Sequence, residues 1–131
     1  MKKPNQSLTY SFSITNDDKS PQKILFERLA NKWFLMILAD LFHNDSRFNS
    51  LLKSHHGLSQ KMLSQTLKNL EEDGLIDRQV NSNKIPVEVF YSITTFGRSL
   101  IEITIPLFEW SNQNIIKLHS ARKKFAKKYE R

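Results

Sequence analysis

The 131-residue chain has no cysteine, only three glycines and no apolar run long enough to cross a membrane. Without cysteine it can form neither a disulfide nor a thiolate metal site, and no thiol can sense oxidants. Three glycines are too few for a glycine-rich phosphate loop, and the chain has no nucleophile elbow and no HExxH metal motif. Because a signal peptide is also missing, we expect a cytoplasmic protein. Because the catalytic and metal-binding motifs are missing, we expect a protein that is not an enzyme and needs no cofactor or metal.

Basic residues outnumber acidic ones, but the excess is concentrated at one end of the chain. The net charge is +7 and the pI is about 9.7. Residues 117–131 hold seven of the 20 Lys and Arg and one of the 13 Asp and Glu, so this tail carries +6 of the total. Exposed Lys and Arg attract polyanions regardless of sequence. The tail either adds sequence-independent affinity for nucleic acid or is a solvated helix end.

Residues 58–78 carry the most informative pattern, a capped amphipathic helix followed by a glycine. Apolar residues recur at helical spacing and predict one buried face: Met62, Leu63, Leu67 and Leu70. The opposite face is polar and consists of Ser59, Gln60, Lys61, Ser64, Gln65 and Lys68. Such side chains can bond base edges and phosphates, while the acids at residues 71–73 are held at the far end. The pattern predicts a DNA recognition helix over residues 59–73, or else an ordinary surface helix.

The segments around this helix complete a winged helix-turn-helix pattern. Downstream, residues 75–81 and 87–94 are rich in β-forming residues and are joined by a turn, which predicts a hairpin, or wing. Upstream, residues 47–56 are predicted to form a positioning helix. Its first two residues, Arg47 and Phe48, could instead form a short strand that joins the wing sheet.

Two helices are predicted before this unit, one starting at Pro21 and one formed by the nearly all-apolar residues 33–42, which must lie in the core. The sequence thus divides into an N-terminal arm (1–19), a winged helix-turn-helix domain (20–95) and a C-terminal helix with a basic tail (96–131). In the arm, Leu8, Tyr10, Phe12 and Ile14 alternate with polar residues. That alternation fits either an ordered strand or a flexible tail.

The C-terminal helix carries more apolar surface than one small domain can cover, so we expect it to pair with a second copy of the chain. Pro106 is expected to kink or break it. The residues expected at the dimer interface are Leu100, Ile103, Leu107, Phe108 and Trp110.

Two residue clusters give weaker signals. His55 and His56 are adjacent and point about 100° apart on a helix, so a solvated helix end is expected rather than a metal site. The aromatic residues Trp33, Phe34, Phe108 and Trp110 either line a pocket for a small-molecule effector or are plain core.

The chain from Pro21 to Trp110, about two thirds of its length, resembles the HxlR-type branch of the MarR-like winged helix-turn-helix transcriptional regulators. The strings that carry the resemblance are NKWFLMIL, RFNSLL, GLSQKMLSQTLKNLEEDGLIDR, YSIT and FGRSLIEI. The resemblance implies a mainly α fold with a small β-hairpin and a long C-terminal dimerisation helix. It also implies a bacterial homodimer that binds double-stranded DNA at an inverted-repeat operator, with residues 59–70 in the major groove and residues 81–86 as the wing tip.

The chain departs from that family at three positions. Ser20 stands where members commonly carry a cysteine, so any switch must be reversible ligand binding rather than thiol chemistry. Glu88 and Phe90 stand where an arginine and a glutamate are usual, so the expected wing contacts come from Arg78, Asn83 and Lys84.

The alternative function is a winged-helix module for protein–protein contact, without a specific DNA target.

Overall fold

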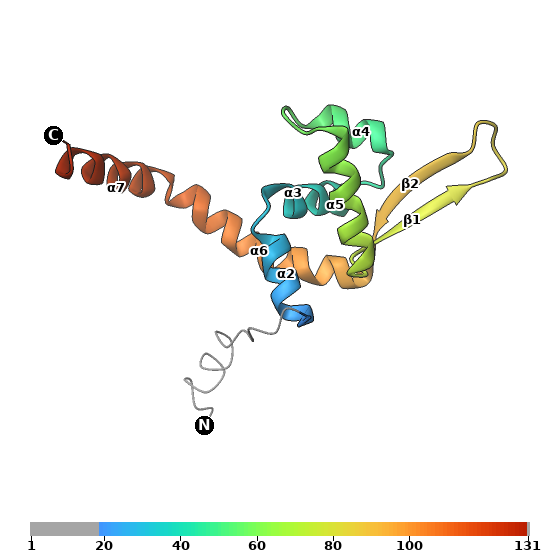
Figure 1. Ribbon diagram of the computed structural model, residues 1–131, viewed down its shortest axis with the longest axis horizontal. Coiled ribbons are helices and arrows are strands. Elements are labelled where there is room, and N and C mark those ends of the chain that lie inside the picture. Colours follow the sequence, from blue (N-terminus) through green and yellow to red (C-terminus); the bar gives the residue numbers. More distant parts are fainter. Residues whose placement is uncertain (1–18, 131) are drawn as a thin grey trace, which may run out of the picture.

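The computed structural model describes residues 19–130 and is mainly helical, as predicted (Figure 1). The elements in chain order are α2 (Pro21–Leu29), α3 (Lys32–His43), α4 (Phe48–Ser54), α5 (Gln60–Glu72), β1 (Ile76–Asn81), β2 (Glu88–Ile93), α6 (Thr95–Gln113) and α7 (Ile115–Lys128). The expected alternation of the N-terminal arm lies outside the described residues.

Polar side chains determine where several of the helices begin, because they accept backbone N–H groups that have no partner within the helix. Ser20 accepts from the N–H of Lys23 ahead of Pro21, and Asn31 accepts from the N–H of Trp33 at 2.9 Å. Ser59 caps α5 as predicted, at 3.0 Å from the N–H of Met62.

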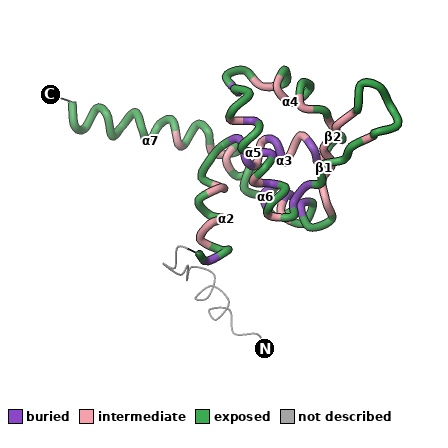
Figure 2. The backbone as a smooth tube through the Cα atoms, turned by 45° about the vertical axis from the view of Figure 1, so that its right-hand side comes forward, coloured by how far each residue is buried: buried purple, intermediate pink, exposed green. Residues whose placement is uncertain are grey.

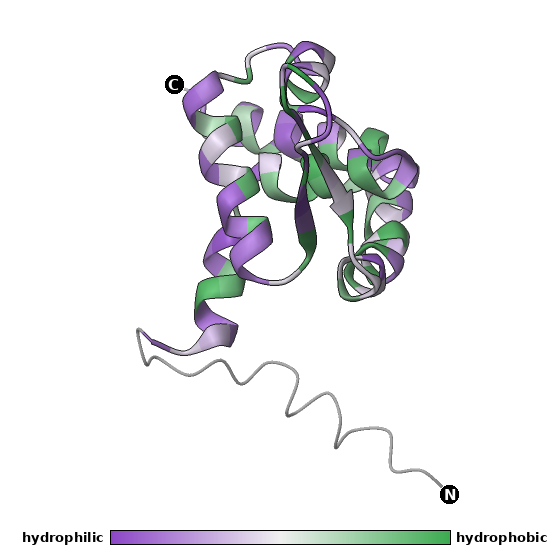
Figure 3. Cartoon of the chain, turned by 90° about the vertical axis from the view of Figure 1, so that its right-hand side faces the viewer, coloured by the Kyte–Doolittle hydropathy of each residue, from purple (hydrophilic) through white to green (hydrophobic). Residues whose placement is uncertain are grey.

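Helix α3 forms the centre of the core, as its apolar sequence predicts. Its buried residues are Trp33, Phe34, Ile37, Leu38 and Leu41. They lie in one cluster with side chains from the other elements: Leu51, Leu58, Leu63, Leu67, Leu70, Leu75, Ile76 and Ile101. Figure 2 shows buried segments on α3 and α5, and Figure 3 shows hydrophobic and hydrophilic residues alternating along the helices of the body.

The wing follows α5 directly. Gly74, at a φ of 73°, ends the helix in a left-handed conformation that glycine adopts without strain. The strands then pair antiparallel from Ile76 opposite Ile93 to Asn81 opposite Glu88 (Figure 1).

A third segment joins the hairpin, but at a different residue from the one predicted. Ser46 pairs with Tyr91 through two backbone hydrogen bonds of 3.0 and 2.8 Å. The prediction of a strand at Arg47 and Phe48 was wrong, because Arg47 is the extended N-cap of α4 and Phe48 is its first residue. The helix also ends at Ser54 rather than at residue 56, since the backbone of His55 is extended.

The C-terminal helices leave the body after a short stretch of contact. Pro106 lies inside α6 without ending it, and the interruption lies at Asn114 instead. Only Gly97, Ile101 and Thr104 of α6 are buried, and α7 buries no residue in the chain as described. Helix α7 therefore extends away from the core (Figures 1 and 2).

Candidate nucleic-acid interface

The outward face of α5 carries the six polar residues predicted there. Ser59, Gln60, Lys61, Ser64, Gln65 and Lys68 are all exposed. The opposite face buries Leu63, Leu67 and Leu70 as predicted, together with Thr66, while Met62 is half-buried. The helix thus presents hydrogen-bonding groups and two lysines, Lys61 and Lys68, to solvent. This part of the helix surface has no acidic residue.

Two of these six side chains also make contacts within α5. The Ser59 hydroxyl oxygen accepts the capping bond from Met62. The Gln65 amide Nε2 donates to Asn69 Oδ1 at 2.9 Å, across one helical turn. Sequence reasoning missed Asn69, although an amide pair at i and i+4 is a spacing at which helical side chains meet.

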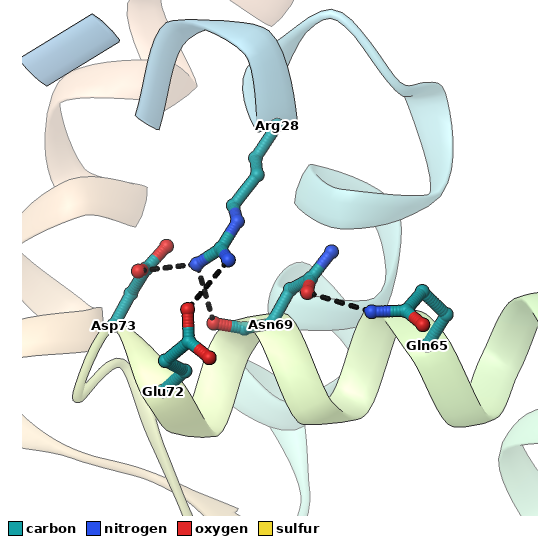
Figure 4. Close-up of polar contacts among 5 residues, drawn as sticks. All are labelled: Arg28, Gln65, Asn69, Glu72 and Asp73. Carbon is teal, nitrogen blue, oxygen red and sulfur yellow. Dashed lines mark hydrogen bonds and ion pairs between the residues drawn. The ribbon is translucent and has the colours of Figure 1, made fainter. Parts of the chain in front are cut away.

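Arg28, from α2, binds the acidic end of α5 (Figure 4). Its Nη1 donates to Asp73 Oδ1 at 2.5 Å and to the backbone oxygen of Asn69 at 3.3 Å, and its Nη2 donates to Glu72 Oε1 at 2.7 Å. More than 40 residues separate Arg28 from these partners, so no local pattern in the sequence could have revealed the contact.

The Arg28 contacts change the electrostatics at this end of α5. Hydrogen bonding to Arg28 and the charge of its guanidinium hold the pKa of Glu72 below its ordinary value. Burial alone would lower the pKa of Arg28, but its bonds to Glu72 and Asp73 and their charges raise it overall. The guanidinium therefore stays charged and offsets part of the negative charge that follows the polar face.

One cation of the wing, Lys84, is already paired with a carboxylate. Lys84 Nζ lies 3.3 Å from Glu88 Oε1, and the same oxygen also binds the guanidinium of Arg47, which sequence reasoning missed. Arg78 is exposed on β1. Asn83 is exposed as well, and its backbone N–H donates to Asn81 Oδ1 at 3.1 Å within the turn.

The two weaker clusters differ from expectation. His55 is half-buried, because its Nε2 bonds to Asp40 Oδ2 and its ring contacts Trp33 edge-on at 5.6 Å, whereas His56 is exposed. The residues from 19 to 130 contain no group of three His, Cys, Asp or Glu that could hold a metal. No helix in that range is long and apolar enough to span a membrane.

The four aromatic residues do not lie together in the described part of the single chain. Trp33 and Phe34 are core residues, whereas Phe108 and Trp110 are exposed on α6. A cavity of about 480 Å³ lies instead between α2, the end of α5 and α6. Its lining comprises Pro21, Leu25, Glu72, Asp73, Leu75, Phe96, Ser99, Leu100 and Ile103.

The apolar residues predicted for dimerisation lie mostly on the surface of the single chain. Leu100 is half-buried, while Ile103 is 71%, Leu107 59%, Phe108 41% and Trp110 54% exposed. Large apolar side chains exposed on one helix are typical of a surface that another molecule covers.

Comparison with known proteins adds independent evidence. The model of the HxlR-like helix-turn-helix family matches residues 28–119. The uncharacterized HTH-type transcriptional regulator YdeP of Bacillus subtilis is 32% identical over 122 residues, which cover 91% of this chain and 94% of that protein.

Solved structures agree with the fold. The transcriptional regulator ytfH from Salmonella typhimurium superposes with a TM-score of 0.71 at 28% identity, covering 80% of this chain and 93% of that one. The reduced form of YodB from B. subtilis superposes with a TM-score of 0.63 at 30% identity, covering 72% and 92%. The chain therefore belongs to the HxlR-like helix-turn-helix family, whose members are winged-helix transcriptional regulators and not enzymes.

Proposed function

We propose that this regulator acts as a homodimer on an inverted-repeat operator, with α5 in the major groove of each half-site. The observation that carries the proposal is the exposed polar face of α5, on which Gln60, Lys61, Ser64, Gln65 and Lys68 point away from the core. Glutamine can bond adenine through both amide atoms, and lysine gains most from phosphate. Gln65 and Ser64 are assigned to base edges, and Lys61 and Lys68 to phosphates.

The wing is the second proposed contact. Arg78 and Asn83 are exposed donors on the hairpin, and Lys84 lies beside them at the turn. Lys84 forms an ion pair with Glu88, so it attracts DNA phosphates less strongly than an unpaired lysine would. We therefore assign base recognition to α5 and only register along the duplex to the wing.

Dimerisation is assigned to the exposed apolar side of α6. Leu107, Phe108 and Trp110 are exposed and can be buried across a two-fold axis. A dimer that reads two successive major grooves must hold its recognition helices about 34 Å apart. Light scattering at micromolar concentration should give twice the 15.4 kDa chain mass. Leu107→Glu should shift the mass toward the monomer, whereas Glu102→Gln, an exposed change on the same helix, should not. A monomeric wild-type protein would contradict the assignment.

The decisive experiment is selection of bound fragments from genomic DNA by the purified protein, followed by titration of the enriched site at several salt concentrations. Binding should weaken steeply as salt rises, because counterions are released when Lys and Arg contact phosphate. Gln65→Ala should relax the preference at one base pair per half-site, and Lys68→Ala should weaken all sequences alike. Absence of any enriched sequence would favour the protein–protein alternative.

For a small-molecule effector, the candidate site is the cavity between α2, α5 and α6. Leu100 and Ile103 line it and also belong to the proposed dimer surface, so an occupant could change the separation of the recognition helices. Titration with small aromatic amines, followed by nuclear magnetic resonance, should perturb Phe96 and Leu100. Shifts confined to other parts of the chain would exclude this cavity for that class of compound.

A further inference from the structure

We infer that Asn69 is a specificity-determining residue that acts by fixing the orientation of the Gln65 amide. The inference rests on the proposed function, in which Gln65 reads a base edge. Asn69 itself is half-buried, whereas Gln65 is exposed. Asn69 is therefore a positioning residue, and Gln65 is the group that touches DNA.

The geometry that supports this role is a short chain of hydrogen bonds along α5 (Figure 4). Gln65 Nε2 donates to Asn69 Oδ1 at 2.9 Å. At Asn69 the backbone oxygen accepts from Arg28 Nη1 at 3.3 Å and from the N–H of Asp73 at 3.0 Å. The Asn69 side chain, which accepts from Gln65, is thus attached to a backbone position that two donors hold, Arg28 from α2 and Asp73 at the end of α5.

The bond to Asn69 has a chemical consequence for base reading. A glutamine amide has two N–H donors and one oxygen with two lone pairs. Asn69 uses one donor, and the other N–H together with Oε1 makes no further bond within residues 19–130. One donor beside one acceptor is the pair that adenine matches in the major groove. With its orientation fixed, the amide presents this pair in one order only.

Without Asn69 the exposed amide could rotate and present its donor and acceptor in either order. Ordering a free side chain on binding also costs conformational entropy, which lowers the gain from the correct base. The loss would appear as reduced discrimination at one base pair, while the phosphate contacts made by lysines would continue to supply sequence-independent affinity.

The test compares Asn69→Leu, Asn69→Asp, Gln65→Ala and the Gln65→Ala/Asn69→Leu double variant on the selected operator and on operators altered at single positions. Leucine cannot accept the bond, whereas aspartate can. The measured quantity is the ratio of affinities for the preferred and altered base, which cancels the uniform repulsion between an added carboxylate and DNA.

Gln65→Ala should reduce discrimination at one position by about 5- to 150-fold, the range of a bidentate base contact. Asn69→Leu should reduce it at that same position, Asn69→Asp should retain it, and the double variant should match Gln65→Ala. Asn69→Ala, a smaller change with high helix propensity, replaces the leucine variant if that protein does not fold.

The outcomes separate the two hypotheses. If Gln65→Ala lowers discrimination but neither Asn69→Leu nor Asn69→Ala does so in folded protein, the role of Asn69 is refuted and the base contact stands. Loss of discrimination at every position in the Asn69 variants, or an equal loss in Asn69→Asp, would also refute it. If Gln65→Ala leaves the preference at every position unchanged, the base contact assigned under the proposed function fails, and the role of Asn69 fails with it.

Discussion

Replacement of Gly97 by alanine should destabilise the protein, although alanine is the better helix former. A Cβ atom at this position would lie 2.1 Å from the backbone oxygen of Leu75 and 2.8 Å from Ile93 Cγ1. Non-bonded carbon contacts are favourable at about 3.5–4.0 Å, so α6 would have to move by roughly 1 Å or more. The Leu75 oxygen also accepts the N–H of Thr94 at 3.0 Å, and the same movement would strain that bond.

The magnitude follows from opposing contributions. Overpacking costs about 1–3 kcal/mol and a weakened hydrogen bond about 1 kcal/mol, while alanine gains about 1 kcal/mol over glycine inside a helix. Because the clash is with backbone rather than with a flexible side chain, we expect the upper part of the range, a loss of about 2–3 kcal/mol in the free energy of unfolding.

Equilibrium urea unfolding, followed by circular dichroism at one fixed protein concentration, measures this loss. Gly57→Ala is the matched control, because Gly57 has a φ of 86° and a Cβ there would meet nothing within 4 Å. That variant should lose only about 1–2 kcal/mol, from backbone strain alone. A Gly97→Ala protein as stable as the wild type would refute the packing argument.

Four further predictions follow from the contacts and the composition. Arg28→Met should lower stability more than Arg28→Lys at neutral pH. Because Arg28 holds the pKa of Glu72 below 4.5, the stability that comes from the pairing of Glu72 with Arg28 should be lost in unfolding experiments as pH falls through the lowered pKa, and the two variants should then differ less. Glu88→Gln should raise affinity for operator and random DNA alike in binding titrations, since two cations lose their carboxylate partner. Deletion of residues 120–131 should lower both affinities by similar factors and flatten the salt dependence; unchanged binding would indicate a solvated helix end. Treatment with diamide should leave operator binding unchanged, because the chain has no cysteine. Mass spectrometry is the control for methionine oxidation, and loss of binding without any methionine oxidation or other adduct would contradict the prediction.

Most of the fold could be predicted from the sequence, because helix ends and buried faces depend on residues that are close together in the chain. Ser59 and Gly74 mark the two ends of α5, and the spacing of leucines between them determines which face is buried. The sequence alone could not show whether Pro106 or Asn114 interrupts the last helix. A proline at that position removes one hydrogen bond and crowds the carbonyl four residues earlier, which favours a kink or a break, yet α6 continues past Pro106 to Gln113.

The parts of the site that sequence reasoning missed depend on contacts between distant segments. Arg28 reaches Asp73 across 45 positions, and Arg47 reaches Glu88 across 41. Asp40 likewise bonds His55, which connects α3 to the residue after α4. No spacing rule along the chain specifies such pairs, because they arise only when the helices have packed. The Gln65 and Asn69 pair was local and could have been found.

Helix α7 has a consequence for how the protein responds to its own concentration. It has 14 residues, none of them buried in the single chain, and Asn114 separates it from the helical bonds of α6. Isolated helices shorter than about 12–15 residues are marginal in water. Ile115, Ile116 and Phe125 of α7 are exposed. If the proposed dimer covers them as well as α6, folding of this segment is coupled to association, and dilution should reduce helical content before the core unfolds. The basic tail would then be an ordered rod mainly in cells that hold enough of the regulator to occupy its operator.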